Sequence, residues 1–251
     1  MGLKSPLLRL VIAIVTGAFT WWVYVKFARY MGFQRPEFLA SILLGSVFLH
    51  ELGHLLSFER HGIPCAMSFV VIAGGTSPLD IKAVERLPDT HKAEAYIAGM
   101  FGNIVAVAIA AMVYMGGLCS AVDVERVANL NASLIVFNLI PLAIFDGSRF
   151  VKVLFRNIAP RKETLLFELT SVPVAVAMLA LLIYKGHATP ALPLVLWGLH
   201  RRSHEENHDD GAARAMTLEQ RIWWAVLFTI LVVGSAVVYS TTNDWILLRP
   251  T

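Results

Sequence analysis

Two histidines and a glutamate lie within one apolar segment, at a spacing that suits metal chemistry. The segment reads His50-Glu51-Leu52-Gly53-His54. Positions i and i+4 share one face of a helix, so His50 and His54 can bind one metal ion together. Glu51 lies one step round the helix, near such an ion but free to act as a base. This is the H-E-x-x-H arrangement, in which two imidazoles bind zinc and the glutamate is a general base.

This residue set suits hydrolysis by metal-activated water. Neutral imidazole is a good zinc ligand, and a catalytic zinc site keeps one position open for water. Zinc lowers the pKa of that water towards about 7. A nearby carboxylate can then take a proton from the water and hand it to a leaving amine. The motif therefore predicts one Zn²⁺ ion held by His50 and His54, with Glu51 as the general base.

The same five-residue pattern occurs a second time, at His204 to His208, and His200 extends its helical spacing. The surroundings separate the two matches. The first lies in an apolar run, where an ionisable group is costly and is expected to have a partner or a function. The second lies among charged residues, where such groups cost almost nothing. We interpret the second group as a solvated segment, with adventitious metal binding as the alternative.

A third zinc ligand must come from elsewhere in the chain. Asp146 follows the apolar run 134–145 and precedes Gly147. Pro141 interrupts that run, where it would break or kink a helix. Unwound backbone at membrane depth is tolerated only inside protein or beside a wet cavity, and Asn138 adds a polar group there. Asp146 is therefore the predicted third ligand. A helix N-cap is its alternative role, and the two can coexist.

The composition places these residues in a membrane. Of the 251 residues, 57% are hydrophobic and 16% are charged, whereas about a quarter of a soluble domain is charged. We expect one membrane-embedded domain over residues 1–251. The net charge is +3, but Lys and Arg lie between apolar runs, as is usual for membrane proteins, so no nucleic-acid binding is expected. Two cysteines are too few for a disulfide scaffold.

Six apolar runs approach the length that crosses a bilayer as a helix. They lie at about 7–27, 37–58, 93–117, 127–145, 165–184 and 219–240. The predicted fold class is an all-α polytopic membrane protein with about six transmembrane helices. A β-like run at 67–73, followed by Gly74 and Gly75, predicts a short hairpin or re-entrant segment after the second helix. The basic segment 147–164 suits an interfacial helix, and 185–218 leaves the span count open.

The predicted spans place the candidate ligands at one depth. The second and fourth spans run in the same direction, so His50, His54 and Asp146 all lie towards ends on one side. His50 would lie roughly 12 Å from the end of its helix at about 1.5 Å per residue. The basic cluster after the fourth span favours the cytoplasm for that side and for both termini.

The chain resembles the site-2 protease family of intramembrane metalloproteases. The resemblance rests on H-E-L-G-H at 50–54 and on the N-x-x-P-x-x-x-x-D-G pattern from Asn138 to Gly147. Gly99, Gly102 and Asn103 also look like the family's third helix. Together these motifs cover about residues 38–157. A second proline that many relatives carry before the Asp-Gly is replaced here by other residues.

The resemblance implies a function and a set of roles. It implies zinc held by His50, His54 and Asp146, Glu51 as general base, and Asn138 in substrate binding or in polarising the scissile carbonyl. It implies substrates that are membrane-spanning proteins, such as anti-sigma factors or membrane-tethered regulators, in a bacterial or archaeal cell membrane. No PDZ or CBS domain is seen in the sequence, so a minimal catalytic core is expected.

Several alternatives stay open at this point. A membrane metal transporter and a catalytically silent relative that acts as a binding protein are the competing functions. Gly99, Gly102 and Asn103 could form a packing face or line a substrate path. The hairpin near 67–73 could be structural, or could add a strand to an extended substrate. The substrate and the oligomeric state are not determined by the sequence.

Overall fold

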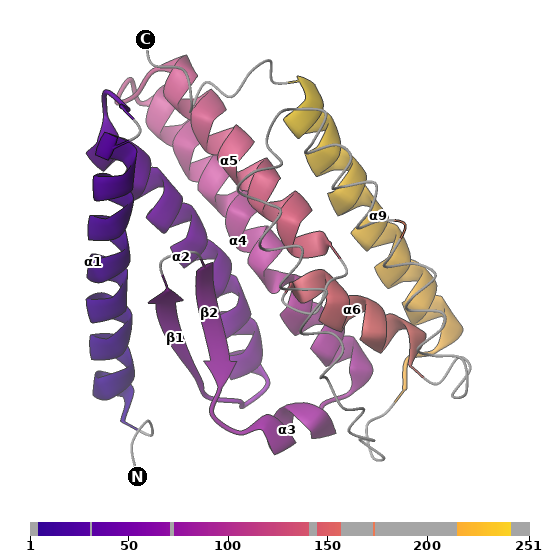
Figure 1. Cartoon of the computed structure of the whole chain (residues 1–251). Coiled ribbons are helices and arrows are strands. Elements are labelled where there is room, and N and C mark those ends of the chain that lie inside the picture. Colours follow the sequence, from indigo (N-terminus) through magenta and orange to yellow (C-terminus); the bar gives the residue numbers. More distant parts are fainter. Residues whose placement is uncertain are drawn as a thin grey trace. The chain divides into compact units, whose positions relative to one another are not determined.

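A computed structural model describes residues 5–30, 32–70, 73–140, 145–156, 173 and 215–241 (Figure 1). In chain order its elements are α1 (Pro6–Tyr30), α2 (Pro36–Arg60), β1 (Cys65–Val70), β2 (Ala73–Pro78), α3 (Ile81–Arg86), α4 (Asp89–Met115), α5 (Ala121–Leu139), α6 (Asp146–Phe155) and α9 (Leu218–Thr241). The described residues are mostly helical, and the hairpin predicted after the second helix is confirmed.

Four helices in the described part of the chain are long and apolar enough to cross a membrane. They are α1, α2, α4 and the segment Leu218–Ser235 of α9. These correspond to the first, second, third and last predicted runs, and they are consistent with a multi-pass membrane protein. The predicted fifth run, 165–184, lies outside the described residues apart from position 173. The segment 185–214, which holds the second histidine group, lies outside them entirely.

The fourth predicted span differs from the helix that forms. The prediction was 127–145, whereas α5 begins at Ala121, ends at Leu139 and is not among the four candidate spans. The early start has a local cause. Asp123 accepts hydrogen bonds from the backbone and hydroxyl of Ser120, and the Ser120 hydroxyl accepts one from the Asp123 backbone. This reciprocal arrangement is a capping box, which satisfies helix N–H groups that have no intrahelical partner.

Helix α2 carries the histidine motif and has a clear signal at each end. Pro36 occupies its first turn, where the missing N–H costs no intrahelical hydrogen bond. At the other end, Ile63 N–H donates to Phe58 O and Gly62 N–H donates to Glu59 O. Gly62 has φ +76°, the left-handed conformation that glycine adopts readily in such a Schellman end.

The two strands form an antiparallel hairpin in which Cys65 pairs with Pro78 and Val70 with Ala73. The sequence predicted one β-like run as far as Ala73. In the structure the first strand ends at Val70, and Ala73 begins the second strand, which contains Gly74 and Gly75. The predicted end of the first strand at Ala73 is therefore wrong by three residues, because the chain turns between Val70 and Ala73.

The hairpin packs beside α1 and α2 (Figure 1). Phe69 and Met67 of β1 form a buried cluster with Val47 of α2. On the edge of β1 that faces away from β2, Thr16 of α1 accepts the Phe69 N–H at 3.1 Å. On the same edge, Arg9 of α1 donates to the Cys65 carbonyl at 2.7 Å. Helix α1 therefore covers the outer edge of β1.

The chain divides into two compact units. The first contains α1, α2, the hairpin, α4 from Ala98 onward and α5 as far as Ile135. The second contains residues 85–97 and, among the described residues, the end of α5, α6 and α9 as far as Val232.

In the second unit, α6 is held by a buried ion pair and by aromatic packing. Asp89 is fully buried at the start of α4, and Arg156 Nη1 lies 3.2 Å from its Oδ1. Arg221 of α9 donates to the carbonyls of Leu154 and Arg156. Phe150 stacks on an aromatic ring of α9 at 5.1 Å. Of the segment 147–164, for which an interfacial helix was predicted, residues 147–155 belong to α6 and residues 157–164 lie outside the described residues. Arg156, which follows α6, pairs with Asp89, and the interfacial position stays a prediction.

Candidate metal site

The face of α2 that points inward carries all three residues of the motif. His50, Glu51 and His54 are 5%, 7% and 6% exposed, whereas Phe48 and Leu56 on the outward face are 43% and 58% exposed. The Nε2 atoms of the two histidines lie 3.2 Å apart. The i, i+4 spacing therefore brings both imidazoles to one point, as the sequence predicted.

The separation of the two imidazoles suits a shared ion. Zinc binds imidazole nitrogen at about 2.0–2.1 Å, so two such ligands at a tetrahedral angle lie roughly 3.3 Å apart. The observed Nε2–Nε2 distance of 3.2 Å is close to this value. The His50 and His54 rings are also nearly perpendicular, at 80°. The pair needs little rearrangement to bind one ion.

Asp146 is the first residue of α6, and its neighbour explains how the chain turns there. The N-cap of α6 is Phe145, so Asp146 is not itself the N-cap that was its alternative role. A Cβ on Gly147 would lie 2.3 Å from the carbonyl oxygen of Leu139. Only glycine allows this approach between the start of α6 and the end of α5. The predicted kink at Pro141 lies outside the described residues.

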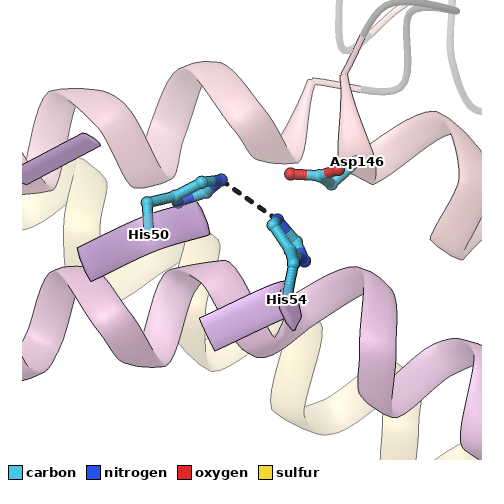
Figure 2. Close-up of side chains that lie close together, drawn as sticks. All are labelled: His50, His54 and Asp146. Carbon is cyan, nitrogen blue, oxygen red and sulfur yellow. Dashed lines mark hydrogen bonds between the residues drawn. The ribbon is translucent and has the colours of Figure 1, made fainter. Parts of the chain in front are cut away.

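His50, His54 and Asp146 form one group. Each offers one ligand atom, and these atoms all lie within 4.8 Å of one another. Figure 2 shows the two imidazoles and the carboxylate turned towards one another. Two imidazoles and a carboxylate are a donor set that zinc accepts, with room for a further ligand. The three residues therefore form a possible metal site, and the predicted ligands come together.

Strand β2 closes over Glu51. A Cβ on Gly74 would lie 2.6 Å from Glu51 Cγ and 2.9 Å from its Oε1. The hydroxyl of Thr76 donates to the Glu51 carbonyl oxygen at 2.9 Å. Gly74 thus lies inside a strand, where glycine is normally unfavourable, because the side chain of Glu51 occupies the space that a Cβ would need.

The backbone of α4 forms a wall against the imidazoles. A Cβ on Gly99 would lie 2.5 Å from His54 Nε2 and 2.6 Å from His50 Nε2. Nearby, Gly53 of α2 faces the Ala98 carbonyl, and Gly102 faces the Leu49 carbonyl, each leaving no space for a Cβ. The close approach agrees with the packing alternative for Gly99 and Gly102, since small residues let helices approach closely, and a role in a substrate path stays a prediction.

Two asparagines lie behind His50. Asn103 Oδ1 is 2.7 Å from His50 Nδ1, and Asn103 Nδ2 donates to Asn131 Oδ1 at 2.8 Å. Asn103 was among the residues predicted from the sequence, whereas Asn131 was not. The available signal was its position as an amide in an apolar run, where polar side chains are expected to have partners. Asn138 lies in the last turn of α5, and its predicted role stays a prediction.

The cysteines do not contribute to the group. Both are free thiols, Cys65 buried and Cys119 partly buried. Burial raises the pKa of the Cys65 thiol to about 12, so this residue stays protonated at neutral pH. A buried, protonated thiol is neither a metal ligand nor a nucleophile.

No protein-family model matches the chain, and neither the curated proteins nor the solved structures contain a significant match. The described residues themselves define the class: a helical membrane protein with a buried His-x-x-x-His pair that forms a possible metal site with an aspartate.

Proposed function

We propose that this protein is a zinc-dependent intramembrane endopeptidase of the site-2 protease type, which cleaves membrane-spanning proteins. The observation that carries the proposal is the grouping of His50, His54 and Asp146. Glu51 adds to it, because a carboxylate is buried one residue from the first histidine. A binding protein or a purely structural site has no need of that carboxylate beside its metal ligands.

In this mechanism the chain holds the reactants and moves one proton. His50, His54 and Asp146 would hold one Zn²⁺ ion, which when bound supplies an acidified water and polarises the scissile carbonyl. Glu51 takes a proton from the attacking water while the oxygen of that water bonds to the carbonyl carbon of the substrate. Glu51 then delivers that proton to the nitrogen as the C–N bond breaks. Asn138 is proposed to bind the substrate or to polarise its carbonyl.

The hairpin offers an edge for an extended substrate. A protease acts on extended backbone, and pairing with an exposed strand supplies that conformation. Because helix α1 covers the outer edge of β1, we propose that the outer edge of β2 pairs with the substrate. Gly74 of β2 lies against Glu51. A substrate strand beside β2 would therefore run close to the proposed base.

The proposed partners follow from the resemblance and the composition. The substrate would be a membrane-spanning protein, such as an anti-sigma factor or a membrane-tethered regulator, in a bacterial or archaeal cell membrane. The site would lie nearer the cytoplasmic side.

The test compares purified wild-type protein with Glu51→Gln and His54→Ala. Zinc content is measured by mass spectrometry, and cleavage is followed on a membrane-spanning reporter co-reconstituted in vesicles. We expect one zinc per wild-type chain, retention of zinc without cleavage in Glu51→Gln, and loss of both in His54→Ala.

Three results would overturn the proposal. Wild-type protein without bound zinc would remove the metal site, and cleavage by Glu51→Gln would remove the assigned base. Metal flux into the vesicles without reporter cleavage would favour the transporter instead.

A further inference from the structure

We propose that Asn131, acting through Asn103, holds His50 in the one neutral tautomer that can bind metal through Nε2. The inference rests on the proposed metal site and deepens it, because it assigns positioning residues behind one ligand. All the residues involved lie in the first compact unit.

A continuous chain of hydrogen bonds runs from the backbone of α5 to the imidazole. Asn131 Nδ2 donates to the Val127 carbonyl at 2.8 Å and to the Ser46 hydroxyl at 2.9 Å. Asn131 Oδ1 accepts from Asn103 Nδ2 at 2.8 Å. Asn103 Oδ1 lies 2.7 Å from His50 Nδ1. Both asparagines are fully buried, so water does not compete for these bonds.

The direction of the chain follows from its first member. A backbone carbonyl can only accept, so the amide atom of Asn131 that faces Val127 must be the NH₂ group. Its oxygen then faces Asn103, which must present its own NH₂ group in return. The remaining Asn103 oxygen faces His50, and a carbonyl oxygen accepts only from a nitrogen that carries hydrogen. His50 therefore carries its proton on Nδ1, and its lone pair is on Nε2.

That lone pair is where a metal ligand needs it. His50 Nε2 faces His54 Nε2 at 3.2 Å, the side on which Asp146 also lies. A His50 ring with its proton on Nε2 would have to move that proton before it could bind an ion. Partners behind a metal-binding histidine are known to fix tautomer and ring orientation in this way.

The competing explanation is that the asparagines only join three helices. Polar side chains do hydrogen-bond across helices in membranes, and Ser46, Asn103 and Asn131 come from α2, α4 and α5. The two explanations differ in what they predict for His50. Interhelical bonding alone predicts a change in stability on substitution, whereas positioning also predicts a change in tautomer.

The experiment reads the tautomer without metal and the zinc affinity separately. Chelated protein labelled with ¹⁵N-histidine is studied by NMR in micelles, where Nδ1 and Nε2 shifts report which nitrogen is protonated. The His50 signals are assigned from their loss in His50→Gln. Zinc affinity is measured by competition with a chelator. The variants are Asn131→Leu, Asn103→Leu and Asn103→Asp, with Asn129→Leu as the matched control on α5.

We expect wild-type His50 to carry its proton on Nδ1. Asn103→Leu and Asn131→Leu should give mixed tautomers and zinc affinity about 10- to 100-fold weaker. Asn103→Asp still accepts from Nδ1, so it should keep the wild-type tautomer and bind zinc more tightly than Asn103→Leu does. The control should match wild type in both measurements, because Asn129 Oδ1 is buried without a hydrogen bond to the described residues.

The proposal is overturned if wild-type His50 is protonated on Nε2, a result that needs no variant to fold. It is also overturned if Asn103→Leu and Asn131→Leu lose only thermal stability and keep both tautomer and affinity. Wild-type protein that binds no zinc would instead defeat the proposed function, while the tautomer of the metal-free protein would still decide the present inference.

Discussion

At the scale of single residues, the missing side chains of two glycines shape the candidate site as much as its ligands do. Gly99 leaves space for both imidazoles, and Gly74 leaves space for the Glu51 side chain. The two positions touch different parts of the site. Substituting Gly99 should therefore affect metal binding, whereas substituting Gly74 should affect the action of Glu51 as the proposed base.

Gly99→Ala is expected to weaken zinc binding. The added Cβ would lie 2.5–2.6 Å from ring atoms of His54 and His50, so the rings must shift away from their shared point. We expect zinc affinity at least about 10-fold weaker, as for other substitutions that displace metal ligands. Chelator competition measures this, with Gly45→Ala as control because nothing lies within 4 Å of a Cβ there. Equal zinc affinity in Gly99→Ala and wild type would contradict the close contact between Gly99 and the two imidazoles.

Gly74→Ala is expected to impair cleavage but not metal binding. Its Cβ would lie 2.6 Å from Glu51 Cγ and would push that side chain aside. General-base catalysis contributes about 10²- to 10⁴-fold, so we expect a rate at least about 10-fold lower with zinc content unchanged. Gly75→Ala is the adjacent control, since its Cβ would meet nothing within 4 Å. Loss of zinc in Gly74→Ala, or a rate equal to that of Gly75→Ala, would go against this assignment.

At the scale of elements, the position of α6 depends on charged residues far from the site. Arg221 of α9 donates to the carbonyls of Leu154, in the last turn of α6, and Arg156, just after it. Arg156 in turn pairs with the buried Asp89. These contacts hold the helix whose first residue is Asp146. They also explain why Arg156, one of the basic residues after α5, lies against protein groups.

Arg156→Leu is expected to destabilise the protein strongly. Asp89 is fully buried, with 0% of its surface exposed, and its Oδ2 already has no hydrogen bond to the described residues. Removing the cation leaves an uncompensated buried charge, which costs about 3 kcal/mol or more. Unfolding in a denaturing detergent measures the loss. The double variant Asp89→Asn with Arg156→Leu should recover part of it, and failure to recover any would show that the ion pair is not the cause.

At the scale of the whole molecule, one of the two H-E-x-x-H matches is proposed to bind the catalytic metal. The first lies on a buried face of α2 and joins Asp146 in one group. The second, with His200, His204 and His208, lies outside the described residues. Its assignment as a solvated segment therefore stays a prediction.

Paired substitutions separate the two matches. We expect Asp146→Ala to lower zinc content, because the metal loses one of three protein ligands. We expect Glu205→Ala to leave zinc content and reporter cleavage unchanged, because a solvated carboxylate has no role in the site. Mass spectrometry and the vesicle assay measure both. A drop in zinc for Glu205→Ala, together with no change for Asp146→Ala, would reverse the assignment.

The sequence alone determined the features that depend on short-range patterns. Apolar runs of bilayer length identified α1, α2, α4 and α9, because helix formation in lipid follows from local hydrophobicity. The i, i+4 spacing by itself places His50 and His54 on one face of a helix. The capping box at Ser120 was also local. Hydropathy does not detect it, and α5 therefore begins six residues before the apolar run 127–145.

Only the tertiary structure decided which backbone and side chains surround the two imidazoles. Nothing in the local pattern requires Gly99 to lie against both rings, or Gly74 to lie against Glu51. Nor does it show that Asn131 reaches His50 through Asn103. These contacts join residues 23 to 53 positions apart along the chain, so they form only when the helices and strands pack against one another. Hydrophobic periodicity says which face of an element is buried, whereas packing decides which residues meet there.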